Sequence, residues 1–191
     1  MILNYLSVIA SILLVALAAG RGFMLRKRGI NAFVFGVSDR SDFLLMPVVA
    51  LFFYTVLTCA FGLPFPAELK ALFVKSIAAG WLGMALCVAS LIWFAVTLKA
   101  FGDSFRIGID ETAPDKLVTG GVFAVSRNPI YLAFISFILG MFFVYPNITI
   151  LLVLILFAAV IHSQVLREEK FLRGHYGEEY EAYCRRVRRY L

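Results

Sequence analysis

Five apolar runs dominate the hydrophobic pattern of this chain, and polar segments of very different length separate them. The runs cover residues 1–20, 43–63, 76–98, 130–145 and 148–163. About 20 apolar residues in a helix span a hydrocarbon core of roughly 30 Å. The pattern therefore predicts an all-α integral membrane protein with about five transmembrane helices. Because the runs are solidly apolar, they do not fit the alternating strands of a membrane β-barrel.

The first run allows two interpretations. Ala16-Leu17-Ala18 has the small residues of a signal-peptide cleavage site. A signal peptide carries its positive charges before the apolar core, however, and here they follow it in the stretch RGFMLRKRG. We therefore expect a first transmembrane helix.

The later runs predict more than simple spans. The fourth and fifth are separated only by the turn signal YPN, so we expect a tight helical hairpin. Beyond them, apolar side chains recur at steps of three and four residues, which predicts an amphipathic C-terminal helix broken near Gly174 and Gly177. These apolar side chains are Phe171, Leu172, Tyr176, Tyr180, Tyr183, Val187 and Leu191.

The composition agrees with a membrane protein, and the charge distribution adds an orientation. The chain is 62% hydrophobic and 16% charged, with a mean hydropathy of +0.89. Of its 18 Lys and Arg residues, all but Lys70 and Lys75 fall in segments on one side of the predicted spans. This bias places the N-terminus outside and the C-terminus in the cytoplasm. The net charge of +6 therefore indicates contact with membrane lipids and not with nucleic acid. By analogy of size we expect a prokaryotic inner membrane.

Polar residues that are candidates for chemistry gather around the fourth and fifth runs. Asn128 and Pro129 open the fourth helix as a cap and a first-turn proline would, which needs no ligand. Gly120 and Gly121 just before them favour a close approach of the backbone to something else, and a helix N-terminus attracts anions or nucleotide-like ligands. Glu168 and Glu169 follow the fifth run, either as a solvated helix end or as a cation-binding pair.

Several other kinds of site find no support in the sequence. The three cysteines form no C-x-x-C motif, and the two histidines, thirteen residues apart, lack further metal ligands at a suitable spacing. The chain also lacks a P-loop, a G-x-S-x-G motif and a dinucleotide-binding glycine fingerprint. We therefore expect no metal site.

From about Gly102 to Leu191 the chain resembles the isoprenylcysteine carboxyl methyltransferase and phospholipid methyltransferase family of membrane enzymes. The resemblance lies in the ordered stretches KLVTGGVFAVSRNPIY, REEKFL and YGEEYEAYCRRV, with a short hydrophobic hairpin after the first. It implies methyl transfer from S-adenosylmethionine to a lipophilic or lipidated substrate, with the cofactor at the cytoplasmic ends of the later helices. Residues 1–191 would form one membrane domain. Within it, 1–98 carry three transmembrane helices, and 99–191 carry a cofactor-binding loop, the hairpin and the C-terminal helix.

The resemblance also implies roles for individual residues. The expected cofactor-binding residues are Asp115, Lys116, Leu117, Val118, Phe123, Asn128, Pro129, Ile130, Tyr131 and Glu168. Asn128 stands where the family often has His, which preserves hydrogen bonding but not protonation chemistry. Gln164 stands where relatives that methylate prenylcysteine carboxylates carry Arg, and Arg167 lies one turn onward. Arg127, Gln164 and Arg167 are the expected catalytic residues.

The methyl acceptor stays open at this point. A prenylcysteine-like carboxylate, a phospholipid amine and another lipophilic acceptor such as a thiol all fit the resemblance. An amine would need a base, for which His162 or Glu169 is a candidate. Two alternatives from other classes are a membrane reductase of similar helical arrangement, for which the chain is short, and a lipid-binding protein without activity.

Overall fold

A computed structural model describes residues 1–27, 29, 44–102 and 117–191 of the chain. Over these residues the protein consists of helices and contains no strand. The helices are α1 (Ile2–Lys27), α2 (Leu45–Phe61), α3 (Ala67–Lys70), α4 (Ile77–Phe101), the 3₁₀ helix η3 (Gly121–Ala124), α5 (Pro129–Val144), α6 (Ile148–Tyr176) and α7 (Glu178–Arg186). The predicted all-α fold is confirmed.

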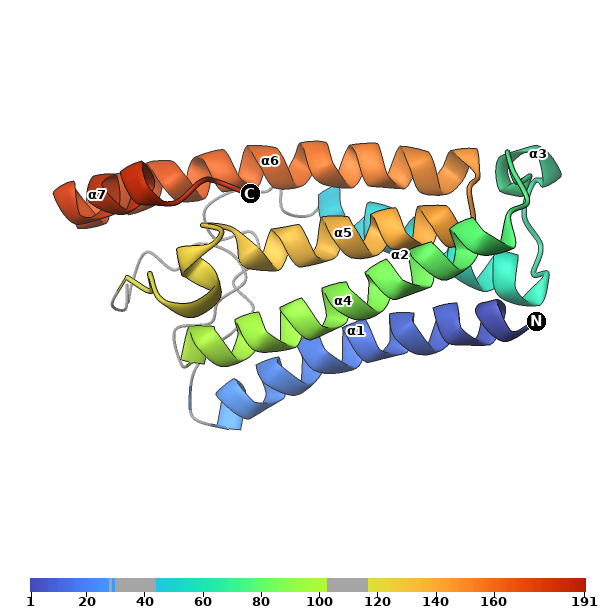
Figure 1. Ribbon diagram of the computed structural model, residues 1–191, viewed down its shortest axis with the longest axis horizontal. Helices are drawn as coiled ribbons and strands as arrows, with labels where there is room; N and C mark the ends of the chain where they lie inside the picture. Colours follow the sequence, from blue (N-terminus) through green and yellow to red (C-terminus); the bar gives the residue numbers. More distant parts are fainter. Residues whose placement is uncertain (28, 30–43, 103–116) are drawn as a thin grey trace.

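Each of the five apolar runs forms a helix. Among the described residues, α1, α4 and α6 are long and apolar enough to cross a membrane, while α2 and α5 are apolar helices of 17 and 16 residues. These helices define a multi-pass membrane protein. They pack as a ring in the order α1, α4, α5, α6, α2, so that α2 closes the ring against α1 (Figure 1).

Two glycines bring α4 and α5 into close contact. A Cβ atom at Gly83 would lie 2.7 Å from the Cβ of Phe143, and one at Gly140 would lie 2.6 Å from the Sγ of Cys87. Only glycine leaves room for both backbones at this crossing. The C-terminal half of α5 is therefore held close against α4.

Helix α6 continues well beyond the fifth apolar run. Its residues after 163 are mostly good helix formers, and it passes through Gly174 without interruption. The break comes at Gly177, which has a φ of 51° and starts α7. The expected amphipathic C-terminal helix is thus present, but Gly174 does not break it.

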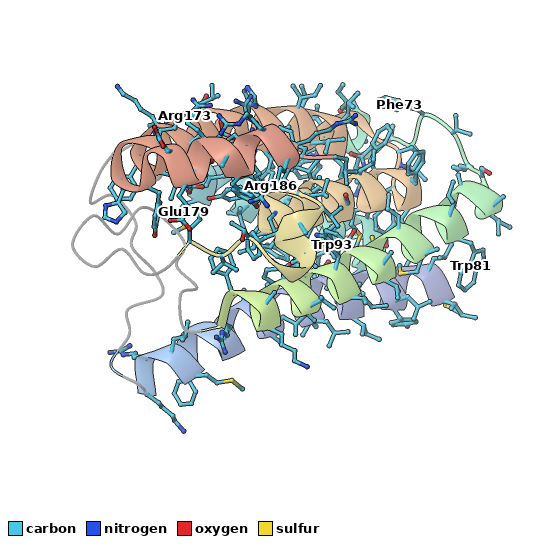
Figure 2. All side chains as sticks on the ribbon, turned by 60° about the vertical axis from the view of Figure 1, so that its left-hand side comes forward. Phe73, Trp81, Trp93, Arg173, Glu179 and Arg186 are labelled. Carbon is cyan, nitrogen blue, oxygen red and sulfur yellow. The ribbon has the colours of Figure 1, made fainter. Side chains whose placement is uncertain are left out.

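Helix α7 turns back along the end of α6, and the C-terminus lies beside α6 near the start of α5 (Figure 1). Arg173 and Glu179 lie at this end of the molecule, whereas Phe73 and Trp81 lie at the other (Figure 2). We call the end that holds the start of α5 and all of α7 the site end.

Candidate functional site at the start of helix α5

The start of α5 is shaped by glycine and proline. Gly121 has a φ of 62°, a left-handed conformation that glycine adopts without strain, and it begins η3. Pro129 then occupies the first turn of α5, where its missing N–H leaves no bond unmade. The Nε1 of Trp93, on α4, donates a hydrogen bond of 3.0 Å to the Pro129 carbonyl. The predicted helix start is confirmed.

Asn128 occupies the N-cap position of α5, but its side chain does not cap the helix. Its Nδ2 instead donates a hydrogen bond of 3.1 Å to the carbonyl of Arg189. The backbone N–H of Arg127 donates to the carbonyl of Arg188 at 3.1 Å. The interpretation of Asn128 as an ordinary cap is therefore wrong, because the C-terminal segment of the chain takes its side chain.

A buried ion cluster joins α5, α6 and the C-terminal segment. One oxygen of Glu169 lies 3.2 Å from a terminal nitrogen of Arg127, and Arg189 donates two hydrogen bonds to the same carboxylate, of 3.0 and 2.8 Å. Glu169 is 2% exposed, and Arg127 also contacts the Sγ of Cys184. Glu169 is thus fully engaged by two guanidinium groups and does not offer a base to a substrate.

Aromatic residues form a second small core between η3 and α7. Phe123 packs edge-to-face on Phe101, with ring centroids 4.7 Å apart. The hydroxyl of Tyr183 donates a 2.6 Å hydrogen bond to the Phe123 carbonyl, and burial raises the pKa of this tyrosine to about 12. Leu117 and Val118 pack against the same core. The predicted cofactor residues Leu117, Val118 and Phe123 therefore lie together, packed against α7.

A polar cluster links α5 to α6. The Tyr131 hydroxyl donates to Oε1 of Glu168 at 2.5 Å, and Nε2 of Gln164 donates to the Tyr131 oxygen at 3.0 Å and to Glu168 at 3.1 Å. Gln164 and Glu168 are four residues apart, so they share one face of α6. Gln164 is 4% exposed, and its Oε1 has no hydrogen-bond partner among the described residues.

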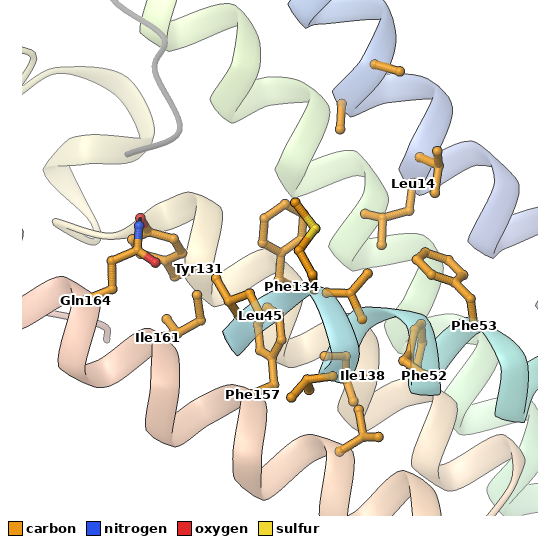
Figure 3. A pocket seen from close by; sticks show the side chains of 17 residues that line it. Leu14, Leu45, Phe52, Phe53, Tyr131, Phe134, Ile138, Phe157, Ile161 and Gln164 are labelled. Carbon is orange, nitrogen blue, oxygen red and sulfur yellow. Dashed lines mark hydrogen bonds between the residues drawn. The ribbon is translucent and has the colours of Figure 1, made fainter. Parts of the chain in front are cut away.

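An apolar cavity of about 340 Å³ reaches this cluster from between α1, α2, α5 and α6. It is lined by Leu14, Val15, Ala18, Ala19, Leu45, Met46, Val48, Val49, Phe52, Phe53, Tyr131, Phe134, Ile138, Val153, Phe157, Ile161 and Gln164. Tyr131 and Gln164 meet at one end of it, and the labelled leucine, isoleucine and phenylalanine side chains line the rest (Figure 3). Along α6 the lining runs from Val153 to Gln164, a distance of about 16 Å, or half of a bilayer core of roughly 30 Å.

The residues predicted for the site fall into separate groups. Tyr131, Gln164 and Glu168 come together, while Arg127 belongs to the ion cluster. Ile130 is buried in the main core, and Arg167 is half-buried next to Glu168 on α6. Asp115 and Lys116 lie outside the described residues. The pattern along the sequence did not reveal the role of Arg189, because its position in a basic tail suggested lipid contact alone.

These observations define a class: a multi-pass helical membrane protein whose apolar cavity ends at a small polar site. The model of the phospholipid methyltransferase family matches residues 76–179, which is more than half of the chain. The chain therefore belongs to the phospholipid methyltransferase family. The match runs from the residue before α4 into α7, so it begins earlier than the resemblance at about Gly102 and includes the polar cluster. Among curated proteins, no match was found.

Membership in this family confirms the resemblance and indicates methyltransferase activity on a lipid-related substrate. The matched region does not include α1 and α2, which supply many of the side chains that line the cavity.

Proposed function

We propose that the protein transfers a methyl group from S-adenosylmethionine to the polar end of a membrane lipid. The observation that carries this proposal is the cavity that ends at Tyr131 and Gln164, within a chain of the phospholipid methyltransferase family. The hydrocarbon chain of the lipid lies in the cavity, and its polar end lies at the cluster. The cavity length of about half a bilayer core suits a lipid from one leaflet.

The residues at the site end fit the proposed cofactor chemically. Glu168 carries a carboxylate and Tyr131 a hydroxyl, which suit a cationic ligand. When bound, S-adenosylmethionine supplies an electrophilic methyl group on a sulfonium. Tyr131, Asn128 and Pro129 at the start of α5 and Glu168 on α6 would hold it.

The protein's own residues position the reactants and exclude water from the cavity. The apolar lining excludes water from the lipid chain, and the Tyr131–Gln164–Glu168 hydrogen bonds fix the polar end of the cavity. Holding two reactants in the right geometry accounts for a large share of many enzymatic rate increases, and exclusion of water strengthens electrostatic interactions at the reacting atoms. The ion cluster of Glu169 anchors α5, α6 and the C-terminal segment to one another.

We also propose that the site end faces the cytoplasm, as the Lys and Arg distribution predicts. This orientation gives a soluble cofactor access from the cytosol, while the lipid enters from the membrane. Modification of single introduced cysteines at the exposed positions Glu178 and Phe73 by a membrane-impermeant thiol reagent tests it, in a background without the native cysteines. In intact cells the reagent should reach position 73 and not position 178.

Calorimetric titration of S-adenosylmethionine and S-adenosylhomocysteine into the purified protein tests cofactor binding. Saturable binding should weaken more than tenfold in Glu168→Gln and in Tyr131→Phe. The matched variants Glu178→Gln and Tyr54→Phe should bind as the unmodified protein does, because Glu178 is exposed on α7 and Tyr54 bonds to the Pro64 carbonyl. Absence of binding by the folded, unmodified protein would refute the proposal.

A further inference from the structure

Helix α7 and the residues that follow it separate their charges along the chain. The acidic side chains of Glu178, Glu179 and Glu181 lie in the first turn of α7, whereas residues 182–191 carry four arginines and no acidic side chain. Glu179 lies at the tip of the site end, and Arg186 lies further back toward the transmembrane helices (Figure 2). Because α7 turns back along α6, its acidic start points away from the membrane and its basic end returns toward it.

Hydrogen bonds fix the basic end of this segment at the start of α5. The backbone N–H of Arg127 donates to the Arg188 carbonyl at 3.1 Å, and Nδ2 of Asn128 donates to the Arg189 carbonyl at 3.1 Å. Tyr190 packs against the main core. The start of α5 is one end of an apolar helix of the membrane domain. The segment therefore lies at the level where lipid headgroups border the hydrocarbon core.

Three arginines of this segment are available to a partner, and we call them the arginine patch: Arg185, Arg186 and Arg188. All three are exposed, and none pairs with a carboxylate among the described residues. Nε of Arg186 donates to the Ala182 carbonyl, which leaves its terminal nitrogens available. The helix dipole accounts for Arg185 and Arg186, which lie in the last turn of α7. It does not account for Arg188, which lies beyond the end of the helix.

From this arrangement we infer that the arginine patch binds the phosphate group of an anionic phospholipid in the leaflet that borders the site end. Guanidinium groups donate paired hydrogen bonds to phosphate oxygens. Each basic side chain near an anionic membrane surface strengthens association about fivefold. A choline lipid has the same phosphate, but its own positive charge offsets it, so the patch favours the anionic lipid. The inference goes beyond the proposed function and does not depend on methyl transfer.

The test measures the binding of one lipid, phosphatidylglycerol. A donor dye is attached to the thiol introduced by Leu191→Cys, at a position that is 68% exposed and close in sequence to the patch, after the native cysteines have been replaced by serine. The protein is reconstituted in phosphatidylcholine vesicles with a trace of acceptor-labelled phosphatidylglycerol, and unlabelled phosphatidylglycerol is added as the competitor. Acceptor-labelled phosphatidylcholine reports contact without net charge. Inorganic phosphate, added as a second competitor, distinguishes a lipid headgroup from a soluble anion.

We expect energy transfer to phosphatidylglycerol to exceed transfer to phosphatidylcholine several-fold. Combining Arg185→Gln, Arg186→Gln and Arg188→Gln should raise the competitor fraction needed for half-displacement about tenfold or more, and high salt should have a similar effect. Lysine at the same three positions should keep most of the preference, because the positive charge is retained.

The matched control combines Arg26→Gln, Lys27→Gln and Lys99→Gln. It removes the same charge from exposed positions at the ends of α1 and α4, which also lie at the site end (Figure 1). This control should keep the preference, and circular dichroism on heating should show that both triple variants are folded. Equal transfer to the two labelled lipids, a preference that survives loss of the patch, or an equal loss in both triple variants would overturn the inference. Displacement by inorganic phosphate would also overturn it, since the site would then bind a soluble anion.

Discussion

Replacing Glu169 by Gln should destabilise the protein more than any single change at an exposed ion pair. Glu169 is 2% exposed, and its carboxylate contacts Arg127 at 3.2 Å and Arg189 at 2.8 and 3.0 Å. The side chain of Arg127 is only 9% exposed. The substitution therefore leaves a buried guanidinium without its counter-charge, a change that destabilises proteins by about 3–5 kcal/mol. The side chain of Arg189 is 32% exposed, so water can hydrate its guanidinium group in the variant. We therefore expect a loss of stability at the lower end of this range, about 3 kcal/mol.

The buried Cys87 offers an assay for this prediction once the half-buried Cys59 and Cys184 have been replaced. Cys87 is buried between α4 and α5, so a thiol-reactive dye reports unfolding as the protein is heated in detergent. Glu169→Gln should lower the midpoint clearly. Glu181→Gln is the matched control, since Glu181 pairs with Arg173 at 2.9 Å with both side chains about half exposed, and it should change little. Equal midpoints for the two variants would refute the argument that the Glu169 cluster joins α5, α6 and the C-terminal segment.

Two further predictions concern packing and the cavity. Gly83→Ala should destabilise the protein by about 1–3 kcal/mol in the same assay, because the added Cβ would clash with Phe143. Gly174→Ala has open space around it and should stabilise α6 by about 1 kcal/mol. A Gly83→Ala variant as stable as the unmodified protein would contradict the close crossing of α4 and α5. Ala18→Phe should fill the cavity and weaken the binding of a fluorescent dodecyl probe at least tenfold. Ala16→Phe, at an exposed position outside the cavity lining, should leave this binding unchanged. Equal effects of the two substitutions would show that the lipid chain lies elsewhere.

The helices of this fold could be predicted because membrane hydropathy is a local property. Each apolar run became a helix, and the turn YPN became the hairpin between α5 and α6. The end of α6 was missed because hydropathy falls after residue 163 while helix formation continues to Tyr176. The break at Gly177 and not at Gly174 depends on which residue must adopt a positive φ, and neither glycine reveals this in the sequence.

The candidate site could be predicted only in part. The motifs identified Tyr131, Gln164 and Glu168 as site residues. In the structure, Tyr131 and Gln164 both donate hydrogen bonds to Glu168. The cavity could not be predicted, since α1 and α2 line it through tertiary packing. The partners of Arg127 and Asn128 come from the last residues of the chain, whose basic composition indicated only the membrane surface.

The most direct test of methyl transfer at this site compares two carboxylate variants in one assay. Membranes containing the unmodified protein, Glu168→Gln or Glu178→Gln are incubated with S-adenosylmethionine that carries a labelled methyl group, and the label in extracted lipid is measured. We expect lipid labelling by the unmodified protein and by Glu178→Gln, and a loss of more than tenfold in Glu168→Gln. Labelling that is absent in all three, or that is equal in all three, would contradict a methyltransferase site at Tyr131, Gln164 and Glu168.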